Sequence, residues 1–260
     1  MQIDSNFPLI TCIMPTANRA YCMEQAVGYF LAQDYPNKEL VIVYNTDGDL
    51  PAGWAQYPQY YLPANVRLVR AGARIIGAKR NEACRNAWGA IIAQWDDDDI
   101  YNTDRLSIQA QPILEGRAHV TGVDNLIFYE APTGDSWMPT PVLHSEIFVG
   151  DVHGGSLMYD RRVWEQVNYP NLPTGEDAWF LRRAMKQGAI VQAVDGMNSF
   201  IYVRHNSNTW KFETDNFRRY AGWIKTELPE WAQEHAIFYR RALLYQQTQQ
   251  MGTRRKATAA

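Results

Sequence analysis

Short apolar segments alternate with longer segments of helical periodicity through the first hundred residues. Apolar runs of four to six residues, which end at Pro15, at Asn45 and at the first of four aspartates, predict buried strands. Strands are expected over residues 9–14, 39–44, 66–69 and 90–95, and helices over 21–33 and 77–88. This alternation predicts an α/β fold, a Rossmann-like and mainly parallel sheet flanked by helices.

The second half of the chain has a more mixed pattern. Strands are expected over 118–123, 126–130, 154–159, 190–194 and 200–204, helices over 104–114, 161–167 and 176–187, and a Pro-, Gly- and Trp-rich loop over 131–151. We expect a main domain over 1–205 with halves that meet at about residue 105, a C-terminal helical extension over 206–250, and a disordered tail over 251–260. The helices are expected to cover one face of the sheet, and docking to a membrane surface is the alternative.

Composition places the chain among ordinary globular proteins. Its 260 residues are 46% hydrophobic and 20% charged, and the net charge of -3 provides no general field that would attract nucleic acid or an anionic membrane. Cys12, Cys22 and Cys84 are too few and too scattered for a disulfide framework, which favours a reducing compartment. Neither a signal peptide nor an apolar run of about 18 residues is recognised. A cytoplasmic location is expected, with a peripheral position at the inner face of a membrane as the alternative.

Four consecutive aspartates, Asp96 to Asp99, follow the strand expected over 90–95. Ligands bind beyond the carboxyl ends of parallel strands, and adjacent carboxylates repel one another, so a divalent cation, Mn²⁺ or Mg²⁺, is expected here. Extended backbone would direct Asp96 and Asp98 to one side and Asp97 and Asp99 to the other. The alternative is a solvated loop, or a helix cap at Asp99.

Several segments together resemble the family 2 glycosyltransferases of the GT-A fold, over about residues 8–204. The segments are Cys12-Ile13-Met14-Pro15-Thr16-Ala17-Asn18-Arg19, Ala32-Gln33-Asp34-Tyr35-Pro36-Asn37-Lys38-Glu39-Leu40-Val41-Ile42-Val43, Ile76-Gly77-Ala78-Lys79-Arg80-Asn81, Trp95-Asp96-Asp97-Asp98-Asp99-Ile100-Tyr101 and Gly175-Glu176-Asp177. All five segments stand in the order that the family has them. The resemblance implies transfer of a sugar, with inversion, from a nucleoside-diphosphate-sugar to an acceptor hydroxyl.

The resemblance also implies roles for individual residues. Asp98 would ligate the metal, with His205 as a further ligand or, alternatively, a packing residue. Asp96 would contact the ribose or a metal-bound water, Asp97 would face away from the metal, and Asp99 would support the run. Asp177 would be the general base, with Glu176 as its rival; stabilisation of a helix N-terminus is the alternative for both.

The remaining expectations concern the two substrates. The nucleotide-sugar side is expected to comprise Pro15, Thr16, Asn18, Arg19, Asn45, Asp47, Lys79, Arg80, Asp96 and Asp97. Arg80 would hold a phosphate or, equally, pair with Asp96. A UDP-sugar is favoured, although Asn45 and Asp47 stand where the family often has Asp-Asp-Gly-Ser. The acceptor is a glycan, a lipid-linked sugar or another hydroxyl compound, and its side is expected to comprise Trp137, His153, Gly155 and Trp179.

Two other functions remain open at this stage. A GT-A-like domain that binds a nucleotide or a glycan without turnover would keep the fold and lose the base or the metal. A sugar nucleotidyltransferase would carry a glycine-rich basic loop after its first strand, and the turn from Pro15 to Arg19 lacks those glycines.

Overall fold

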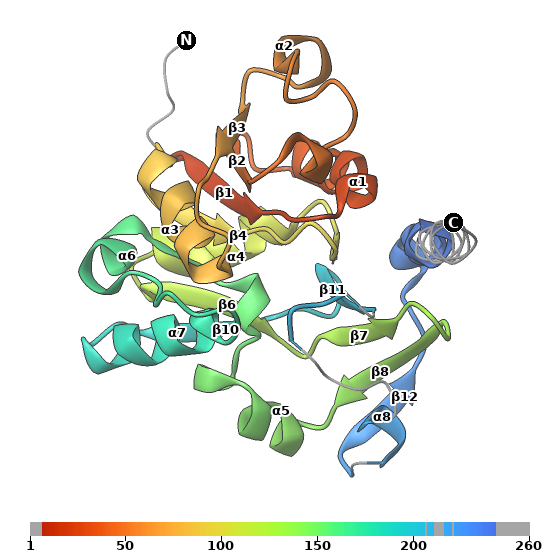
Figure 1. Cartoon of the computed structure of the whole chain (residues 1–260). Coiled ribbons are helices and arrows are strands. Elements are labelled where there is room, and N and C mark those ends of the chain that lie inside the picture. Colours follow the sequence, from red (N-terminus) through yellow and green to blue (C-terminus); the bar gives the residue numbers. More distant parts are fainter. Residues whose placement is uncertain (1–6, 206, 211–215, 220, 243–260) are drawn as a thin grey trace.

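A seven-stranded sheet forms the larger part of the computed structural model, which describes residues 7–205, 207–210, 216–219 and 221–242 (Figure 1). Its strands lie in the order β10-β6-β9-β4-β1-β2-β3, and β9 runs antiparallel to both of its neighbours. Their bounds are β1 (Ile10–Pro15), β2 (Lys38–Tyr44), β3 (Val66–Arg70), β4 (Ile91–Gln94), β6 (Val120–Asp124), β9 (Met158–Asp160) and β10 (Val191–Asp195). The parallel strands β4, β1 and β2 therefore end at one edge of the sheet.

A five-stranded sheet lies beside that edge, with the order β12-β8-β7-β11-β5 (Figure 1). Its strands are β5 (Ile100–Tyr101), β7 (Ile127–Glu130), β8 (Asp135–Pro139), β11 (Phe200–Arg204) and β12 (Trp223–Thr226). Strand β5 follows the aspartate run directly and pairs with β11. The run therefore joins the two sheets.

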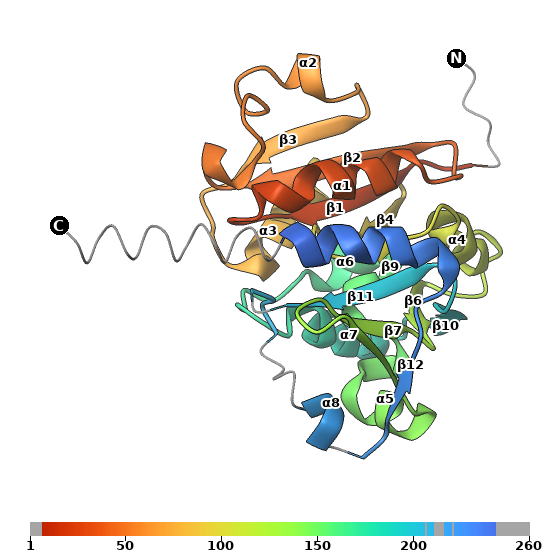
Figure 2. The same cartoon turned by 90° about the vertical axis from the view of Figure 1, so that its right-hand side faces the viewer.

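Helices cover the sheets and connect the strands. They are α1 (Ala20–Leu31), α2 (Pro58–Tyr61), α3 (Ile76–Asn86), α4 (Arg105–Leu114), α5 (Pro141–Ile147), α6 (Arg161–Val167), α7 (Glu176–Lys186) and α8 (Asn216–Arg219), with short 3-10 helices η1 (Asp47–Asp49), η2 (Val149–Asp151) and η3 (Gly154–Ser156). Residues 230–242 are also helical and lie between α1 and β11 in the view of Figure 2. None of the helices in the described ranges is long and apolar enough to cross a membrane.

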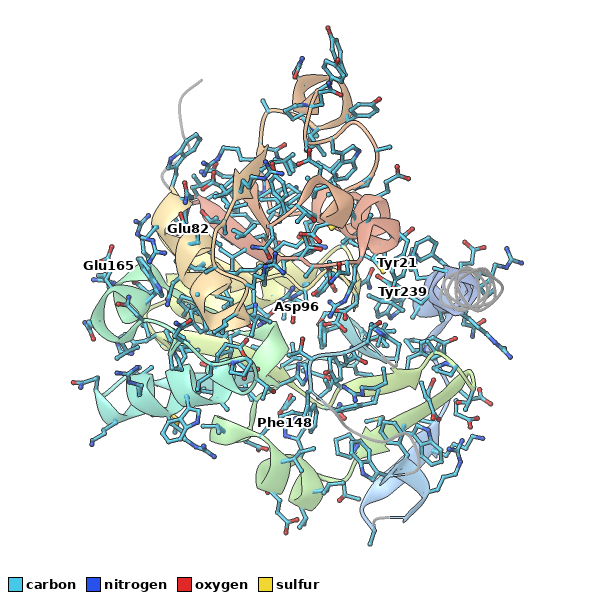
Figure 3. All side chains as sticks on the ribbon, in the orientation of Figure 1. Tyr21, Glu82, Asp96, Phe148, Glu165 and Tyr239 are labelled. Atoms are coloured by element: carbon cyan, nitrogen blue, oxygen red, sulfur yellow. The ribbon has the colours of Figure 1, made fainter. Side chains whose placement is uncertain are left out.

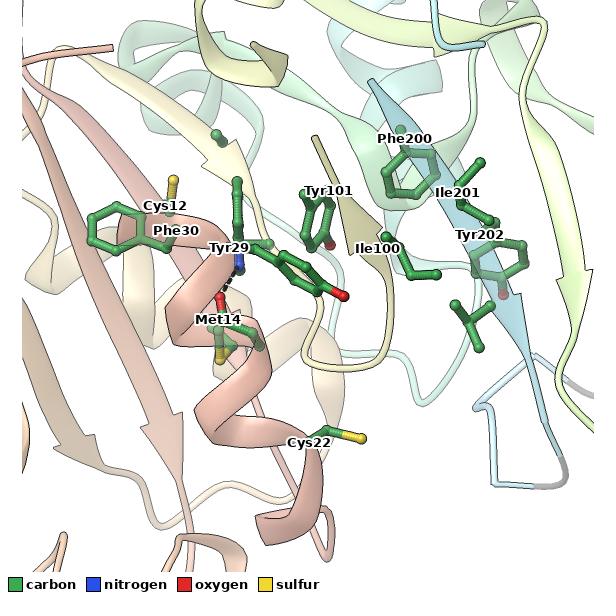
Figure 4. Close-up of a cluster of buried hydrophobic side chains, with 14 of the residues drawn as sticks. Cys12, Met14, Cys22, Tyr29, Phe30, Ile100, Tyr101, Phe200, Ile201 and Tyr202 are labelled. Carbon is green, nitrogen blue, oxygen red and sulfur yellow. Dashed lines mark hydrogen bonds between the residues drawn. The ribbon is translucent and has the colours of Figure 1, made fainter. Parts of the chain in front are cut away.

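Strand β1 is buried on both faces, which explains its unbroken apolar sequence. Ile10, Cys12 and Met14 pack in the core that contains α1 and reaches the smaller sheet. Figure 4 shows Cys12 and Met14 in this core. Ile13 points to the other face and packs in a second core with residues of α3, α6 and α7. Because successive side chains point to opposite faces, one short strand contributes to both cores.

The expected α/β fold, with a mainly parallel sheet and flanking helices, is confirmed, and three local expectations are wrong. Residues 131–151 are not one loop, because they contain β8 and α5. Residues 154–159 are not one strand, because η3 precedes the short β9. The C-terminal extension over 206–250 was expected to be helical, but residues 223–226 form strand β12, since pairing with β8 outweighs their helical pattern. The tail expected over 251–260 lies outside the described residues.

Candidate active site

A cavity of about 490 Å³ opens where the two sheets meet, within the usual size range of small-molecule sites. It lies beyond the carboxyl ends of β1 and β4, as expected for a parallel sheet. Of the residues expected at the site, those that line the cavity are Pro15, Thr16, Arg19, Lys79, Arg80, Asp96, Asp98, His153, Gly155, Glu176 and Asp177. Figure 3 shows Asp96 between the two sheets, with Phe148 on the side of the smaller one.

The four aspartates point in alternating directions. Asp96 and Asp98 line the cavity, whereas Asp97 and Asp99 are fully buried outside its lining. Asp97 accepts hydrogen bonds from the Thr16 hydroxyl and from Arg19 Nη1, both at 2.5 Å. The alternation expected from the sequence is therefore found, although the segment forms a turn rather than a continuous strand.

Asp99 is hydrogen-bonded to two other segments of the protein. Its Oδ1 accepts the backbone N–H of Val203 at 2.9 Å, and its carbonyl accepts the Tyr239 hydroxyl at 2.8 Å. Burial, together with the neighbouring charge of Asp98, raises the pKa of the Asp99 carboxyl well above its ordinary value. Asp99 thus ties the aspartate run to β11 and to the helix over 230–242.

Three side-chain nitrogen atoms surround one carboxylate oxygen of Asp98. Its Oδ2 lies 2.9 Å from Arg19 Nη1, 3.0 Å from His205 Nε2 and 3.3 Å from Asn208 Nδ2. Burial alone would raise the pKa of Asp98, but the charge of Arg19 and the hydrogen bond from His205 outweigh burial and hold that pKa well below its ordinary value. The fold brings His205 to Asp98 across 107 positions of sequence, although His205 itself is not part of the cavity lining.

The charge of the run is balanced by guanidinium groups. Arg19 pairs with Asp97 and Asp98, and Arg80 pairs with Asp96. Among the described residues no cluster of three or more His, Cys, Asp or Glu side chains is arranged to hold a metal ion. Repulsion between the aspartates is therefore relieved within the protein, and it does not by itself require a cation as the sequence argument assumed.

Arg80 connects the aspartate run to helix α7. Its Nη2 lies 3.0 Å from Asp96 Oδ1, and its Nε donates to Glu176 Oε1 at 2.9 Å. The side chain of Arg80 is 2% exposed, and its Nη1 has no hydrogen-bond partner among the described residues. Burial raises the pKa of Glu176 in spite of the opposing charge of Arg80. Of the two expectations for Arg80, the structure shows the pair with Asp96.

Asp177 lies against Gly154, which sequence reasoning did not select, next to Gly155, which was expected on the acceptor side. A Cβ atom at Gly154 would stand 2.1 Å from Asp177 Oδ2, and one at Gly155 would stand 3.2 Å from Asp96 Oδ2. The glycine pair therefore lies between the two carboxylates, at a place where side chains would displace them. The adjacent glycines Gly154 and Gly155 were the feature of the sequence that could have indicated this close approach.

The turn after β1 is held by backbone contacts. Lys79 lines the cavity, but its ammonium donates to the carbonyl of Thr16 at 2.6 Å. Asn18 adopts a positive φ of 58°, and its N–H donates to Asp49 Oδ1 at 2.9 Å. Asn18 shapes this turn without lining the cavity.

Asn45 and Asp47 also lie outside the cavity lining. The amide nitrogen of Asn45 donates to two carbonyls of the following loop, those of Ala71 and Ala73, and Asp47 pairs with Arg70 at 2.6 Å on the surface. Sequence reasoning missed Asp49, which is buried and accepts backbone N–H groups from Asn18, Thr46 and Asn45. Burial would raise the pKa of Asp49, but these three donors outweigh burial and lower it.

The structure divides the four residues expected on the acceptor side. His153 and Gly155 line the cavity. Trp137 does not line it, because it lies in β8 with its ring stacked on that of Phe217 in helix α8. Trp179 is 52% exposed on α7 and is also absent from the lining. The aromatic residues that do line the cavity are Phe148, Tyr202 and Trp210, which sequence reasoning did not select.

Comparison with known proteins gives a family match and several relatives. The family model described as glycosyl transferase family 2 matches residues 11–186, more than half of the chain. WcaA of Escherichia coli K12, named for colanic acid biosynthesis, is 36% identical over 110 residues, which cover 40% of this chain and 37% of WcaA. TuaG of Bacillus subtilis 168, named for teichuronic acid biosynthesis, is 25% identical and covers 78% of this chain and 84% of its own length.

Two solved structures share the fold. TarS of S. aureus in complex with UDP-GlcNAc has a TM-score of 0.60 at 18% identity, over 80% of this chain and 63% of that one. The mannosyltransferase PcManGT of Pyrobaculum calidifontis, in complex with GDP-Man and Mn²⁺, has a TM-score of 0.58 at 19% identity, over 76% and 56%. At these identities the likeness concerns the fold alone.

Proposed function

The chain belongs to glycosyl transferase family 2, and we propose from this membership and the cavity that it transfers a sugar from a nucleoside-diphosphate-sugar to an acceptor hydroxyl in polysaccharide biosynthesis. The observation that carries the proposal is the joint lining of one cavity by Asp96, Asp98 and Asp177. The names of WcaA and TuaG, both tied to polysaccharide biosynthesis, agree with it. A UDP-sugar is the proposed donor, because a neighbour of the same fold binds UDP-GlcNAc.

A divalent cation, Mn²⁺ or Mg²⁺, is proposed at Asp98 and His205. The two side chains fit such a cation, since a carboxylate oxygen and an imidazole nitrogen lie 3.0 Å apart and Asp98 reaches the cavity. A neighbour of the same fold holds Mn²⁺ with its nucleotide-sugar. When bound, the cation supplies Lewis-acid stabilisation of the leaving diphosphate. The guanidinium of Arg19, which now contacts Asp98, would then be free to meet a phosphate.

Asp177 is the proposed general base. Inversion by single displacement requires a carboxylate on the face of the sugar opposite the leaving group, where it accepts the proton of the attacking hydroxyl. Both side chains line the cavity, but Glu176 is less suited to this role because its carboxylate is buried in the ion pair with Arg80, whereas Asp177 is only partly buried. Arg80 would hold Asp96 and helix α7 at a constant separation while the substrates bind.

We propose that the two halves of the chain divide the substrates. The cavity lining before residue 105 comes from residues 15–98, and the lining after it from residues 147–210. The first part would hold the nucleotide and the second the acceptor. The three cysteines are free and buried, which agrees with the reducing, cytoplasmic environment that we propose.

The test is release of nucleoside diphosphate from a panel of UDP- and GDP-sugars in the presence of Mn²⁺. We expect turnover with at least one donor, and a loss of at least about 10²-fold in Asp98→Ala and Asp177→Asn. Glu165→Gln is the matched control, since Glu165 forms only a surface pair with Arg161. Full turnover in either site variant, or in the presence of excess chelator, would contradict the assigned roles.

A further inference from the structure

The lining of the cavity is chemically divided. Four Lys and Arg side chains line the cavity among the described residues. Arg19 comes from the turn after β1, Arg74 from the segment before α3, and Lys79 and Arg80 from the first turns of α3. The lining from residues 147–153 and 202–210 contains neither Lys nor Arg. The first part therefore suits a diphosphate, whereas the second part, within the described residues, supplies no Lys or Arg side chain that would neutralise a phosphate.

Three aromatic rings form one side of the second part, and we refer to Phe148, Tyr202 and Trp210 as the aromatic wall. The rings of Tyr202 and Trp210 are stacked at 6.5 Å with an interplanar angle of 21°, and Phe148 meets Trp210 edge-on at 6.4 Å. The rings come from the segment after α5, from β11 and from the segment after β11. The wall is therefore created only when these distant segments pack together.

Arg204 holds the wall in place without lining the cavity. Its Nη1 donates to the Tyr202 hydroxyl and its Nη2 to the Trp210 carbonyl, both at 3.0 Å. Its guanidinium carbon lies 5.5 Å from the Tyr202 ring centre and 5.4 Å from that of Trp210. Arg204 is only 2% exposed and is absent from the cavity lining, so it supports the two rings from behind.

His153 lies beside the aromatic wall and adds no charge to this part of the cavity lining. Its ring lies 4.4 Å from Tyr202 and 5.1 Å from Phe148, so it packs between two members of the wall. Burial, with smaller effects from the nearby His144, Arg105 and Arg204, lowers the pKa of His153 to about 3. The imidazole is therefore neutral at physiological pH.

We propose that the aromatic wall binds the acceptor as an uncharged pyranoside, whose flat face of C–H groups packs against Trp210 and its neighbours. Aromatic rings offer a large apolar surface that fits such a face, and a phosphorylated acceptor would require a cation, which the described residues of this part of the lining do not supply. This inference rests on the proposed function and adds the chemical class of the acceptor. Asp177 lines the same cavity, so an acceptor on the wall shares the space with the proposed base.

The test is binding of methyl β-glucopyranoside and methyl β-galactopyranoside, with glycerol and glycerol 3-phosphate as probes that lack a ring. The full chain is saturated with UDP and Mn²⁺, and saturation-transfer difference NMR reports which ligand protons contact the protein. We expect transfer to the ring protons of at least one glycoside and none to either glycerol probe. In Trp210→Ala the dissociation constant of the glycoside should rise at least about tenfold, and Trp210→Phe should recover most of the loss.

Trp88→Ala is the matched control, because Trp88 is 70% exposed and does not line the cavity. It should leave glycoside binding unchanged, and the thermal shift caused by UDP with Mn²⁺ should be the same in all three variants. Equal transfer to glycerol 3-phosphate, or unchanged glycoside binding in Trp210→Ala, would overturn the inference. If nucleotides bind and turn over but no pyranoside binds, only this inference fails; if no nucleotide-sugar binds or turns over, the proposed function itself fails.

Discussion

Arg80 Nε donates a hydrogen bond to Glu176 Oε1 at 2.9 Å, and this contact joins helix α3 to helix α7 across 96 positions of sequence. The same guanidinium contacts Asp96 through Nη2 at 3.0 Å. The buried arginine therefore holds one residue of the aspartate run and the helix that carries the proposed base in one rigid unit. Buried ion pairs of this kind do more to define geometry than to add stability.

Replacing Arg80 should lower the stability of the protein, because two carboxylates would lose their ion-pair partner. In Arg80→Met, Asp96 and Glu176 would lose their shared partner, and we expect the free energy of unfolding to fall by about 3–5 kcal/mol. The measurement is urea denaturation monitored by circular dichroism. The double variant Arg80→Met, Glu176→Gln should recover part of the lost stability, because Asp96 is then the only carboxylate left without its arginine partner. A single variant within about 1 kcal/mol of the parent protein would show that water reaches these carboxylates.

Gly154 should tolerate no side chain without loss of activity. A Cβ at this position would stand 2.1 Å from Asp177 Oδ2, so Gly154→Ala must displace the carboxylate or the chain beside it. We expect donor turnover to fall about 10²-fold, which is the usual cost of misplacing a catalytic group by about 1 Å. Gly28→Ala is the matched control, because that glycine lies in α1 with open space at its Cβ. The control should keep its activity and gain about 0.5–1 kcal/mol of stability.

Arg19 should compete with a divalent cation for Asp98. In Arg19→Met the carboxylates of Asp97 and Asp98 lose their counter-charge, and we expect a loss of stability of at least about 3 kcal/mol. Mn²⁺ should restore more of the melting temperature in this variant than it adds to the parent protein, because the cation then replaces the missing charge. Thermal melting with and without Mn²⁺ measures both effects.

Arg85→Met provides the comparison for Arg19, since Arg85 forms only an exposed pair with Glu82. We expect its stability to change by less than about 1 kcal/mol, with the same response to Mn²⁺ as the parent protein. Equal Mn²⁺ shifts in Arg19→Met and in the parent protein would show that the cation does not bind at these carboxylates.

His153 should make the protein sensitive to acid. Its pKa is lowered from the ordinary 6.5 to about 3, chiefly by burial. As the pH falls below 6.5, His153 gains a proton in the unfolded chain but stays neutral in the folded chain. The contribution of His153 to stability is therefore complete above pH 6.5 and falls as the pH drops toward 3. The slope for one such group is about 1.4 kcal/mol per pH unit.

His153→Gln isolates this effect, because glutamine does not titrate. Urea denaturation at pH 7, 6, 5 and 4 should show the stability of the parent protein falling more steeply than that of the variant below pH 6.5. The difference between them should change by about 1.4 kcal/mol for each pH unit in that range. A difference that is independent of pH would mean that His153 gains its proton as readily in the folded chain as in the unfolded one.

Local patterns were sufficient for the four strands and the two longer helices before the aspartate run. Their order was predictable because each of these elements carries its own periodicity and its own stop signal, whereas the short helices η1 and α2 were not expected. The second half was harder. Residues 223–226 have a helical pattern and yet form β12, because their partner is β8, about 85 positions earlier. A single-sequence pattern cannot report a pairing at that distance.

The sequence by itself determined the family motifs, the parallel sheet and the position of the aspartate run at the end of a strand, since all of these depend on residues close together in the chain. Only the tertiary structure decided that Arg19 and Arg80 neutralise the run, that Asp98 meets His205, and that the aromatic wall lines the cavity instead of Trp137. The physical reason is the same in each case. Charge pairing and ring packing act through space, and the partners are brought together by the meeting of two sheets, which no local period encodes.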